Sequence, residues 1–277
     1  MLRQKAEREE FTECNRLMFK SYTYIRLSID DEKAILLLNR PNARNALNAE
    51  MIEELQRAVQ SLYNHPKIKW IELLGSGKHF SAGADLKWMQ NAKNLDYDEN
   101  MRESRKLYQL FKLWKDLPLV TVTYVKGACI GGANGLAAGS DILIAHPEAW
   151  FSFPETSLGL VPATISPFVL KRLSLASAKQ WLLLPGKKSA VEALNKSWVD
   201  KIMNEDSYAD FKTQFRQRIL AVSHQSLQKT KDMLNRLDEE SIKDKETYTA
   251  QLIAETRTSK TGQERMKNFF KTEDHDN

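Results

Sequence analysis

Residues 126–145, KGACIGGANGLAAGSDILIA, carry the strongest structural signal in the sequence. They follow the strand-like run VTVTYV (120–125), pass through Gly131 and Gly132 into a short run of small residues, and continue into the apolar run DILIA. A strand that turns through glycines into a helix leaves unpaired N–H groups at the helix N-terminus, where the helix dipole favours negative charge. The stretch therefore predicts an α/β fold with a turn suited to an oxyanion.

Composition narrows the class of protein. The 277 residues are 42% apolar, enough for a sizeable core, and the formal net charge is +5. Basic and acidic residues are interspersed without a long basic run, which favours a solvated surface over a nucleic-acid face. We expect no membrane span, no secretory signal and a cytoplasmic location. Cys14 and Cys129 lack Cys or His neighbours at metal-ligand spacing, so we expect free thiols and no metal site.

Hydrophobic periodicity alternates between strand and helix along the chain. Asn48 is placed to cap a helix whose apolar face holds Ile52, Leu55, Val59 and Leu62. Residues 91–100 form a polar stretch that we expect to be a mobile lead into a helix through Leu107 and Trp114. Helical spacing dominates from about residue 166. The expected strands are 22–29, 33–39, 68–75, 120–125, 141–145 and 150–153.

A second loop and one acid complete the candidate chemistry. In FSAGAD (80–85), small residues follow a strand, so the backbone can approach a ligand closely. Two preorganised N–H donors from this loop and the glycine turn would stabilise a thioester carbonyl that gains enolate character. Glu155, between a proline and a threonine in FSFPETSLGLVPA (151–163), is an isolated carboxylate that follows these loops. By itself this position is typical of a surface glutamate.

Four motifs in this order resemble the crotonase (enoyl-CoA hydratase/isomerase) superfamily: NRPNARNALN (39–48), HFSAGADLKWM (79–89), the glycine turn and FSFPETSLGLVPA. The resemblance spans about residues 22–272. It implies an α/β, crotonase-like spiral of repeated ββα units with a helical C-terminal trimerisation region. The implied organisation is an N-terminal extension (1–21), a spiral core (22–210) and a helical C-terminal region (211–277). The expected partner is an acyl-CoA substrate, without a separate cofactor, bound by a homotrimer or hexamer.

The resemblance also implies roles for single residues. The oxyanion-hole amides fall on Ala84 and Gly132. Backbone contacts to the adenine of coenzyme A fall on Ala82 and near Ala46, and Arg44 and Lys271 are candidates for its phosphates. Phe269 matches an aromatic residue that the family lays against the coenzyme A of a neighbouring subunit, although core packing would explain it equally well.

The chain departs from the family at Gly135. Typical enoyl-CoA hydratases hold a water between two glutamates, and only the second is present here, as Glu155. Acid–base work then falls on Glu155, assisted by Asn134, Ser140 or an ordered water. The pattern resembles the methylglutaconyl-CoA hydratases, which add water to 3-methylglutaconyl-CoA in leucine catabolism. A Δ3,Δ2-enoyl-CoA isomerase that uses Glu155 alone stays open, as does a non-catalytic RNA-binding protein of the same fold.

A substrate with a distal carboxylate needs a basic partner in the acyl pocket. The sequence offers Lys87, Arg105, Lys171 and Arg172 near the relevant segments, and Trp88 and Met89 are candidates for its walls. Two further departures concern binding and assembly. KSWVDK (196–201) replaces the family's Gly-Leu-Val, and the C-terminal FFKTEDHDN is acidic where relatives are basic.

Overall fold

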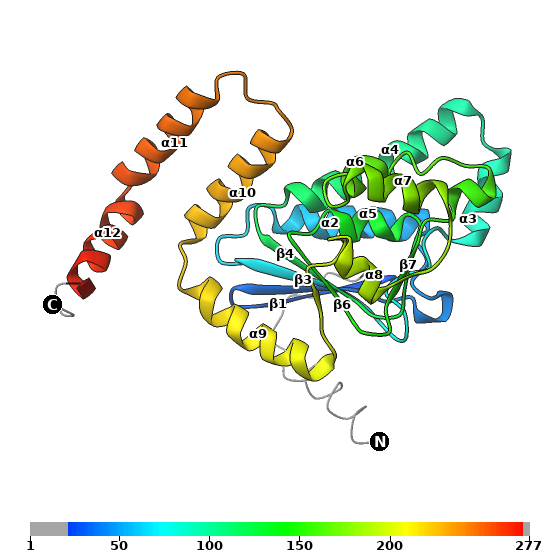
Figure 1. The fold of residues 1–277 in the computed structure, drawn as a ribbon, viewed down its shortest axis with the longest axis horizontal. Coiled ribbons are helices and arrows are strands. Elements are labelled where there is room, and N and C mark those ends of the chain that lie inside the picture. Colours follow the sequence, from blue (N-terminus) through cyan, green and yellow to red (C-terminus); the bar gives the residue numbers. More distant parts are fainter. Residues whose placement is uncertain (1–21, 274–277) are drawn as a thin grey trace. The chain divides into compact units, whose positions relative to one another are not determined.

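The structure of this chain is a computed structural model that describes residues 22–273, with side chains described as far as Phe270. Within this range the strands form a large sheet in the order β1-β2-β3-β4-β6-β9 and a small sheet in the order β5-β7-β8 (Figure 1). The strands are β1 (Ile25–Asp30), β2 (Lys33–Leu38), β3 (Trp70–Gly75), β4 (Val120–Val125), β5 (Ala128–Ile130), β6 (Ile142–Ala145), β7 (Trp150–Ser152), β8 (Lys188–Ser189) and β9 (Lys201–Ile202).

The large sheet is mostly parallel, and the small sheet is mixed. The hairpin β1–β2 is antiparallel and turns at Asp31, whereas β2, β3, β4, β6 and β9 pair in parallel. In the small sheet β5 and β7 are parallel, and β8 is antiparallel to β7. Parallel neighbours need a crossover between them, which explains why helical segments separate the strands along the chain.

The helical segments are η1 (Pro41–Ala43), α2 (Ala49–Leu62), α3 (Leu86–Asn91), η2 (Ala92–Asn94), α4 (Tyr97–Asp116), α5 (Ala133–Ala138), η3 (Glu155–Leu158), α6 (Ser166–Val169), α7 (Leu175–Leu183), α8 (Ala190–Asn195), α9 (Glu205–Leu220), α10 (His224–Asp238), α11 (Lys245–Thr258) and α12 (Lys260–Glu273). Asn48 caps α2 as predicted, with its side chain accepting a hydrogen bond from the Met51 N–H at 3.0 Å. The predicted apolar face of α2 is buried.

Three consecutive segments of the chain repeat the same order of secondary structure. Each has a strand in the large sheet (β3, β4, β6), then an extended segment that pairs in a second layer (Ser81, β5, β7), then a helical segment (α3, α5, η3). Ser81 pairs with Cys129 in parallel, and β5 pairs with β7 in parallel. This is the predicted spiral, and it places the start of three successive helical segments at neighbouring positions.

Helices cover both faces of the large sheet. Helices α2, α4 and α5 lie over one face in Figure 1, with Phe111 and Trp114 of α4 completely buried. On the other face, Tyr208 at the start of α9 stacks on Tyr124 of β4 with ring centroids 4.2 Å apart. The large sheet is therefore covered by apolar side chains on both sides, as expected for parallel strands.

The helix after residue 91 begins earlier than predicted. Residues 91–100 were expected to form a mobile lead, but η2 and the first turn of α4 lie inside them. Asp96 and Glu99 form a capping box: the Asp96 carboxylate accepts from the Glu99 N–H at 2.7 Å, and Glu99 accepts from the Asp96 N–H at 3.0 Å. This reciprocal pair satisfies two N–H groups at the helix start, so the polar sequence is helical.

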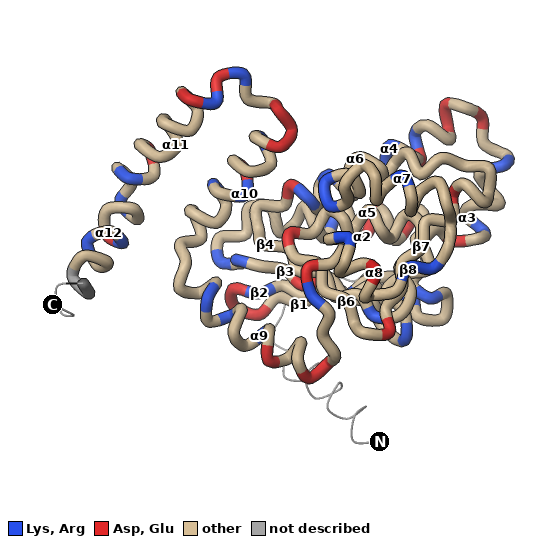
Figure 2. The backbone as a smooth tube through the Cα atoms, viewed as in Figure 1, with Lys and Arg blue, Asp and Glu red and all other residues tan. Residues whose placement is uncertain are grey.

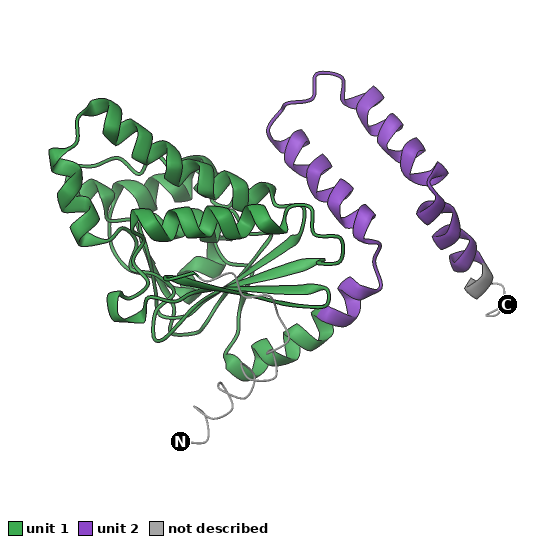
Figure 3. Cartoon of the chain, turned by 180° about the vertical axis from the view of Figure 1, so that it is seen from behind, with its two compact units in different colours: residues 1–215 green, residues 216–277 purple. Residues whose placement is uncertain are grey.

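The chain divides into two compact units, residues 1–215 and 216–277 (Figure 3). The first holds both sheets and the candidate site. The second holds α10, α11 and α12, which agrees with the helical C-terminal region that the sequence predicts. Within this unit Arg265 donates to the Ala221 carbonyl at 2.7 Å, and Lys229 pairs with Glu255 at 3.1 Å.

Candidate active site

The three loops that begin the helical segments of consecutive turns meet at one place. A Cβ added to Gly83, in the first loop, would lie 2.5 Å from the Ile130 carbonyl oxygen in the second, so only glycine allows this approach. A Cβ on Gly131 would lie 3.3 Å from Oε1 of Glu155 in the third. The repeat of the fold thus brings Ala84, Gly132 and Glu155 into one neighbourhood.

The direction of the Ala84 N–H is set by its own peptide plane. The Gly83 carbonyl accepts a hydrogen bond from the Leu47 N–H at 2.7 Å. Because a trans peptide is planar, the N–H of Ala84 points opposite to that carbonyl, away from Leu47. Gly83 itself has φ +83°, a left-handed conformation that favours glycine.

The Gly132 N–H is oriented in the same way. The Gly131 carbonyl accepts from the Asn134 N–H at 2.9 Å in the first turn of α5, so the N–H of Gly132 points outward from the helix start. The Gly131 N–H donates to the Ser152 carbonyl at 2.9 Å, which ties this turn to the strand that leads to Glu155. Within residues 22–273 neither the Ala84 N–H nor the Gly132 N–H has a hydrogen-bond acceptor.

Glu155 is the first residue of η3 and is half-buried. Its Oε2 is buried and has no hydrogen-bond partner among the described residues. Burial raises the pKa of the Glu155 carboxyl, and a hydrogen bond from its own backbone N–H partly opposes the shift. A buried carboxyl with one unsatisfied oxygen and a raised pKa is suited to exchange a proton with a ligand.

The space beside Gly135, the residue at which the resemblance places the first glutamate, is filled by another side chain. A Cβ on Gly135 would lie within 2.6 Å of three ring carbons of Phe111 from α4. The Phe111 ring is fully buried and packs edge-on against Phe168, with centroids 5.7 Å apart. The chain therefore has no room for a longer side chain at residue 135. Of the two glutamates that the resemblance implies, this chain has only Glu155.

Asn134 and Ser140, predicted as possible assistants of Glu155, have structural partners instead. The Asn134 amide donates to the Ser152 carbonyl at 2.9 Å and its oxygen accepts from the Cys129 thiol at 3.3 Å. The Ser140 hydroxyl accepts from the Trp114 indole at 2.9 Å and contacts the Thr123 hydroxyl at 2.6 Å. Both side chains are buried, so these bonds fix α5 in place. Burial also raises the pKa of the Cys129 thiol, which is free; Cys14 lies outside the described residues.

The residues predicted to contact coenzyme A divide into two groups. The structure brings together Arg44, Ala46 and Ala82: the Ala82 N–H donates to the Arg44 carbonyl at 2.9 Å, and the Arg44 side chain is exposed. Phe269 lies on α12, in the second compact unit, and is 59% exposed. Lys271 lies outside the residues whose side chains are described.

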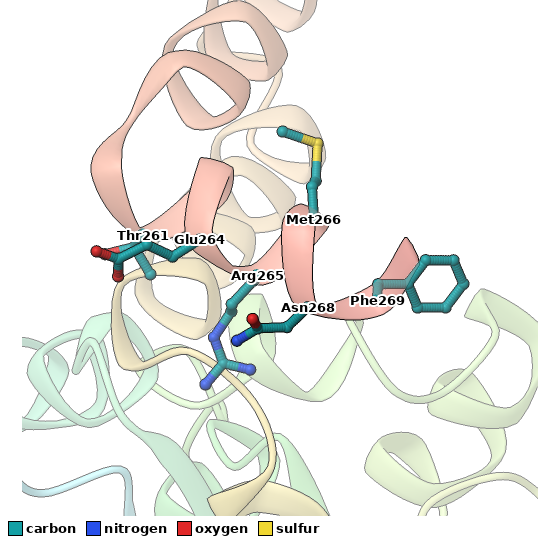
Figure 4. A pocket seen from close by; sticks show the side chains of 6 residues that line it. All are labelled: Thr261, Glu264, Arg265, Met266, Asn268 and Phe269. Carbon is teal, nitrogen blue, oxygen red and sulfur yellow. The ribbon is translucent and has the colours of Figure 1, made fainter. Parts of the chain in front are cut away.

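The structure has two hollows that are not lined by Ala84, Gly132 or Glu155. One of about 860 Å³ is lined by α12 side chains that include Arg265, Met266 and Phe269 (Figure 4). The other, about 390 Å³, lies between α2 and α4 and is lined largely by glutamine side chains and the pair Lys112 and Asp116.

Of the cations predicted for a distal carboxylate, Arg172 is excluded. Its guanidinium donates to the carbonyls of Ser140 and Trp198 at 2.7 and 3.2 Å, and pairs with Asp200 at 3.3 Å. Lys87, Arg105 and Lys171 are exposed. Trp88 is partly buried and donates from its indole to Glu103 at 3.2 Å, and Met89 is also partly buried.

Sequence reasoning missed the residues that hold the loops. Leu47, Phe111 and the pair Arg40 and Asp85 act through contacts between segments remote in sequence. Asp85 alone had a local signal, because an aspartate just before the run LKWM is a typical helix N-cap. Its side chain accepts from the N–H groups of Lys87 and Trp88.

The described residues contain neither a metal-ligand cluster nor a membrane-spanning helix. No cluster of three or more His, Cys, Asp or Glu residues suited to a metal ion occurs in residues 22–273. Over the same part of the chain, no helix has the length and apolar content needed to cross a membrane. Figure 2 shows Lys and Arg interspersed with Asp and Glu along the chain.

Comparison with known proteins identifies the family. The model of the enoyl-CoA hydratase/isomerase family matches residues 31–276. The chain is 30% identical to a crotonyl-CoA hydratase of Syntrophomonas wolfei, over 78% of this chain and 82% of that protein. Among solved structures, an enoyl-CoA hydratase from Shewanella pealeana superimposes with a TM-score of 0.85 at 32% identity, covering 90% of this chain and 94% of that one. An enoyl-CoA hydratase/isomerase from Marinobacter aquaeolei gives 0.84 at 29%, covering 90% and 97%.

The spiral fold, the two oriented amides and these matches agree. The chain belongs to the enoyl-CoA hydratase/isomerase family, as the sequence motifs predicted. None of these three proteins is described as a methylglutaconyl-CoA hydratase, so the comparisons support enoyl-CoA hydratase/isomerase-type chemistry without selecting methylglutaconyl-CoA as the substrate.

Proposed function

We propose that this protein is an enoyl-CoA hydratase in which Glu155 alone performs the proton transfers. The observation that carries the proposal is the Glu155 carboxyl, which has a buried oxygen without a partner among the described residues and lies against the Gly131–Gly132 turn. The N–H groups of Ala84 and Gly132 are the proposed donors to the thioester oxygen.

One carboxylate is sufficient for the complete catalytic cycle. Glu155 takes a proton from water as the oxygen of that water attacks C3 of the 2-enoyl thioester. The C2–C3 double bond becomes the enolate, whose charge rests on the thioester oxygen between the two amides. The protonated Glu155 then delivers the proton to C2, which gives the 3-hydroxyacyl-CoA and returns the carboxylate. A raised pKa supports both halves of this cycle near neutral pH.

The specific substrate we propose is 3-methylglutaconyl-CoA, with 3-hydroxy-3-methylglutaryl-CoA as the product. The support is the glycine at residue 135, which the sequence shares with the methylglutaconyl-CoA hydratases that it resembles. The distal carboxylate of this substrate needs a cation. Since Arg172 is held by backbone carbonyls and Asp200, the candidates that we propose to test are Lys87, Arg105 and Lys171.

A Δ3,Δ2-enoyl-CoA isomerase is the second candidate, and the Phe111 ring favours it specifically. Where a second acid would stand, the chain has an apolar ring. Shuttling a proton between C4 and C2 needs one base and no oriented water. The same Glu155 and the same two amides would serve this reaction.

We also propose that the protein assembles as a homotrimer or hexamer. Between residues 158 and 194, aliphatic side chains lie at least 40% exposed on segments from η3 to α8. They are Leu158, Leu160, Val161, Leu170, Leu175, Leu183, Leu184, Val191 and Leu194. Such a concentration of exposed apolar residues is typical of a subunit interface.

Mass spectrometry of acyl-CoA products tests the function. The protein is incubated separately with 3-methylglutaconyl-CoA, crotonyl-CoA and a 3-enoyl-CoA, each beside a Glu155→Gln control. Gain of one water on the first substrate, absent in the control, supports the specific hydratase. Water added only to crotonyl-CoA supports a general hydratase, and a shifted double bond without added water supports the isomerase.

An RNA-binding protein without catalysis makes a different prediction. It would retain RNA in a strongly salt-dependent manner and turn over none of the three substrates. Lys and Arg are interspersed with Asp and Glu along the described part of the chain (Figure 2), which argues against this alternative.

A further inference from the structure

We propose that the ion pair between Arg40 and Asp85 is a latch that holds the Ala84 N–H in position as an oxyanion donor. This inference rests on the proposed function of Ala84. Both side chains are largely buried, with 23% of Arg40 and 11% of Asp85 exposed, and Nη1 of Arg40 lies 2.6 Å from Oδ2 of Asp85. They are 45 residues apart in sequence.

The latch joins the two segments that orient Ala84. Leu47 donates its N–H to the Gly83 carbonyl at 2.7 Å and accepts from the Asp85 N–H at 2.8 Å, so it brackets Ala84 from both sides. The same Nη1 of Arg40 that binds Asp85 also donates to the carbonyl of Ala46, the neighbour of Leu47, at 3.0 Å. One guanidinium nitrogen therefore connects the residue next to Leu47 with the residue next to Ala84.

Asp85 is held on both of its oxygens. Oδ1 accepts from the N–H groups of Lys87 and Trp88 at 2.8 and 3.2 Å and thereby caps α3, while Oδ2 binds Arg40. Burial alone would raise the pKa of Asp85, but the hydrogen bonds from Arg40 and these two N–H groups outweigh it, so the pKa lies below its usual range. The carboxylate stays charged at neutral pH and keeps Arg40 engaged.

Arg40 is itself fixed in place. Its guanidinium lies over the ring of Tyr24, 5.3 Å from the centroid. Its backbone N–H donates to the side chain of Asn45 at 2.8 Å. The buried Asn45 amide in turn donates to the carbonyls of Ser76 and His79 at 2.9 Å, just before the loop that carries Ala84. These contacts fix the position of Arg40, which its role as a positioning residue requires.

Loss of the ion pair should therefore impair catalysis more than substrate binding. A thioester carbonyl needs both amides most strongly when it becomes an enolate. Loosening the Ala84 loop should therefore reduce kcat more than it raises KM. Small displacements of a positioned group cost about 100-fold in rate.

The test compares Arg40→Met, Arg40→Lys and Asp85→Asn with wild type. Asp85→Asn keeps an N-cap acceptor for α3 while removing the charge that Arg40 binds. We expect Arg40→Met and Asp85→Asn to lower kcat about 100-fold with a smaller change in KM. Arg40→Lys should recover part of kcat, and the Arg40→Met/Asp85→Asn double variant should lose little beyond either single variant.

Arg172→Met is the matched control, because Arg172 also pairs with an aspartate and binds backbone carbonyls but lies outside the candidate site. It should lose thermal stability and keep kcat. The latch is overturned if the Arg40 and Asp85 variants also keep kcat, or if kcat falls only in proportion to the loss of folded protein.

A measurement without turnover separates this inference from the proposed function. Amide hydrogen exchange over residues 82–88 should be faster in Arg40→Met than in wild type and unchanged in Arg172→Met. The fraction of bound acetoacetyl-CoA present as enolate, an analogue of the thioester enolate, should fall in Arg40→Met. Wild type that neither turns over nor binds acyl-CoA would refute the proposed function, while unchanged exchange over residues 82–88 would refute the latch.

Discussion

The ring of Phe111 occupies the space into which any side chain at residue 135 would extend: a Cβ on Gly135 would lie within 2.6 Å of three of its carbons. The two residues belong to α4 and α5 and pack in the core of the first compact unit. The chain thus has Gly135 where the resemblance places the first glutamate, and the bulky apolar ring of Phe111 fills the adjoining space. The arrangement isolates Glu155 as the acid–base candidate.

Introducing the missing glutamate should destabilise the protein. Gly135→Glu forces a side chain against Phe111, so we expect a loss of about 1–3 kcal/mol or more in urea denaturation. Phe111→Ala alone should cost about 3–5 kcal/mol by leaving a cavity. The double variant should cost clearly less than the sum of the two, because each change relieves the other. Strict additivity would contradict the packing of Phe111 against Gly135.

Replacing the acid–base group should remove activity without removing binding. Glu155→Gln keeps the shape of the side chain but cannot accept a proton, so kcat should fall about 100- to 10,000-fold. Affinity for a non-reactive acyl-CoA, measured by calorimetry, should change little. A variant that retains most of kcat would show that another group transfers the proton.

The same variant should have a pH-dependent effect on stability. Burial raises the pKa of Glu155, so the folded state favours the protonated form, and stability falls as pH rises through the folded pKa. At neutral pH we expect Glu155→Gln to melt at a higher temperature than wild type. The difference should shrink below the ordinary pKa of a glutamate, where wild type is protonated in both states. Melting curves of wild type and Glu155→Gln at neutral and acid pH check the sign.

Glu205 should behave in the opposite way. It pairs with Lys126, lies 3.1 Å from His146, and has a pKa lowered to about 2, with the hydrogen bond from Lys126 as the leading cause. Its contribution is present above the ordinary pKa of a glutamate and is lost as pH falls toward 2. Because the side chain is 52% exposed, Glu205→Gln should cost only about 0–1 kcal/mol at neutral pH. A difference from wild type that grows on acidification would contradict this assignment.

The exposed aliphatic residues between η3 and α8 predict a subunit contact. Leu183→Glu should shift the protein toward its monomer mass of 31.9 kDa in sedimentation velocity. Tyr97→Glu, at an 80% exposed residue at the start of α4, is the control and should leave the mass unchanged. Wild type that sediments as a monomer would refute the proposed assembly.

Much of the fold could be predicted because it depends on local signals. Apolar periodicity gave the strands and α2, and Asn48 marked the helix start that the structure shows. The strands β5, β8 and β9 were missed because they have three, two and two residues, too few for a period to appear. The start of α4 was missed because the capping box of Asp96 and Glu99 lies within a stretch that is polar throughout.

The sequence by itself determined the set of chemical groups: two loops of small residues that can expose amides, one glutamate that follows them at residue 155, and a glycine at residue 135. Only the tertiary structure decided how these groups are held. Leu47 and the Gly131–Asn134 hydrogen bond orient the N–H groups of Ala84 and Gly132. Phe111 fills the space beside Gly135, where the other glutamate would stand, and Arg172 is bound to backbone carbonyls. Apart from the Gly131–Asn134 turn, these contacts join residues that lie 24 to 36 positions apart. Their geometry follows from how strands and helices pack, which the sequence pattern around any one residue does not encode.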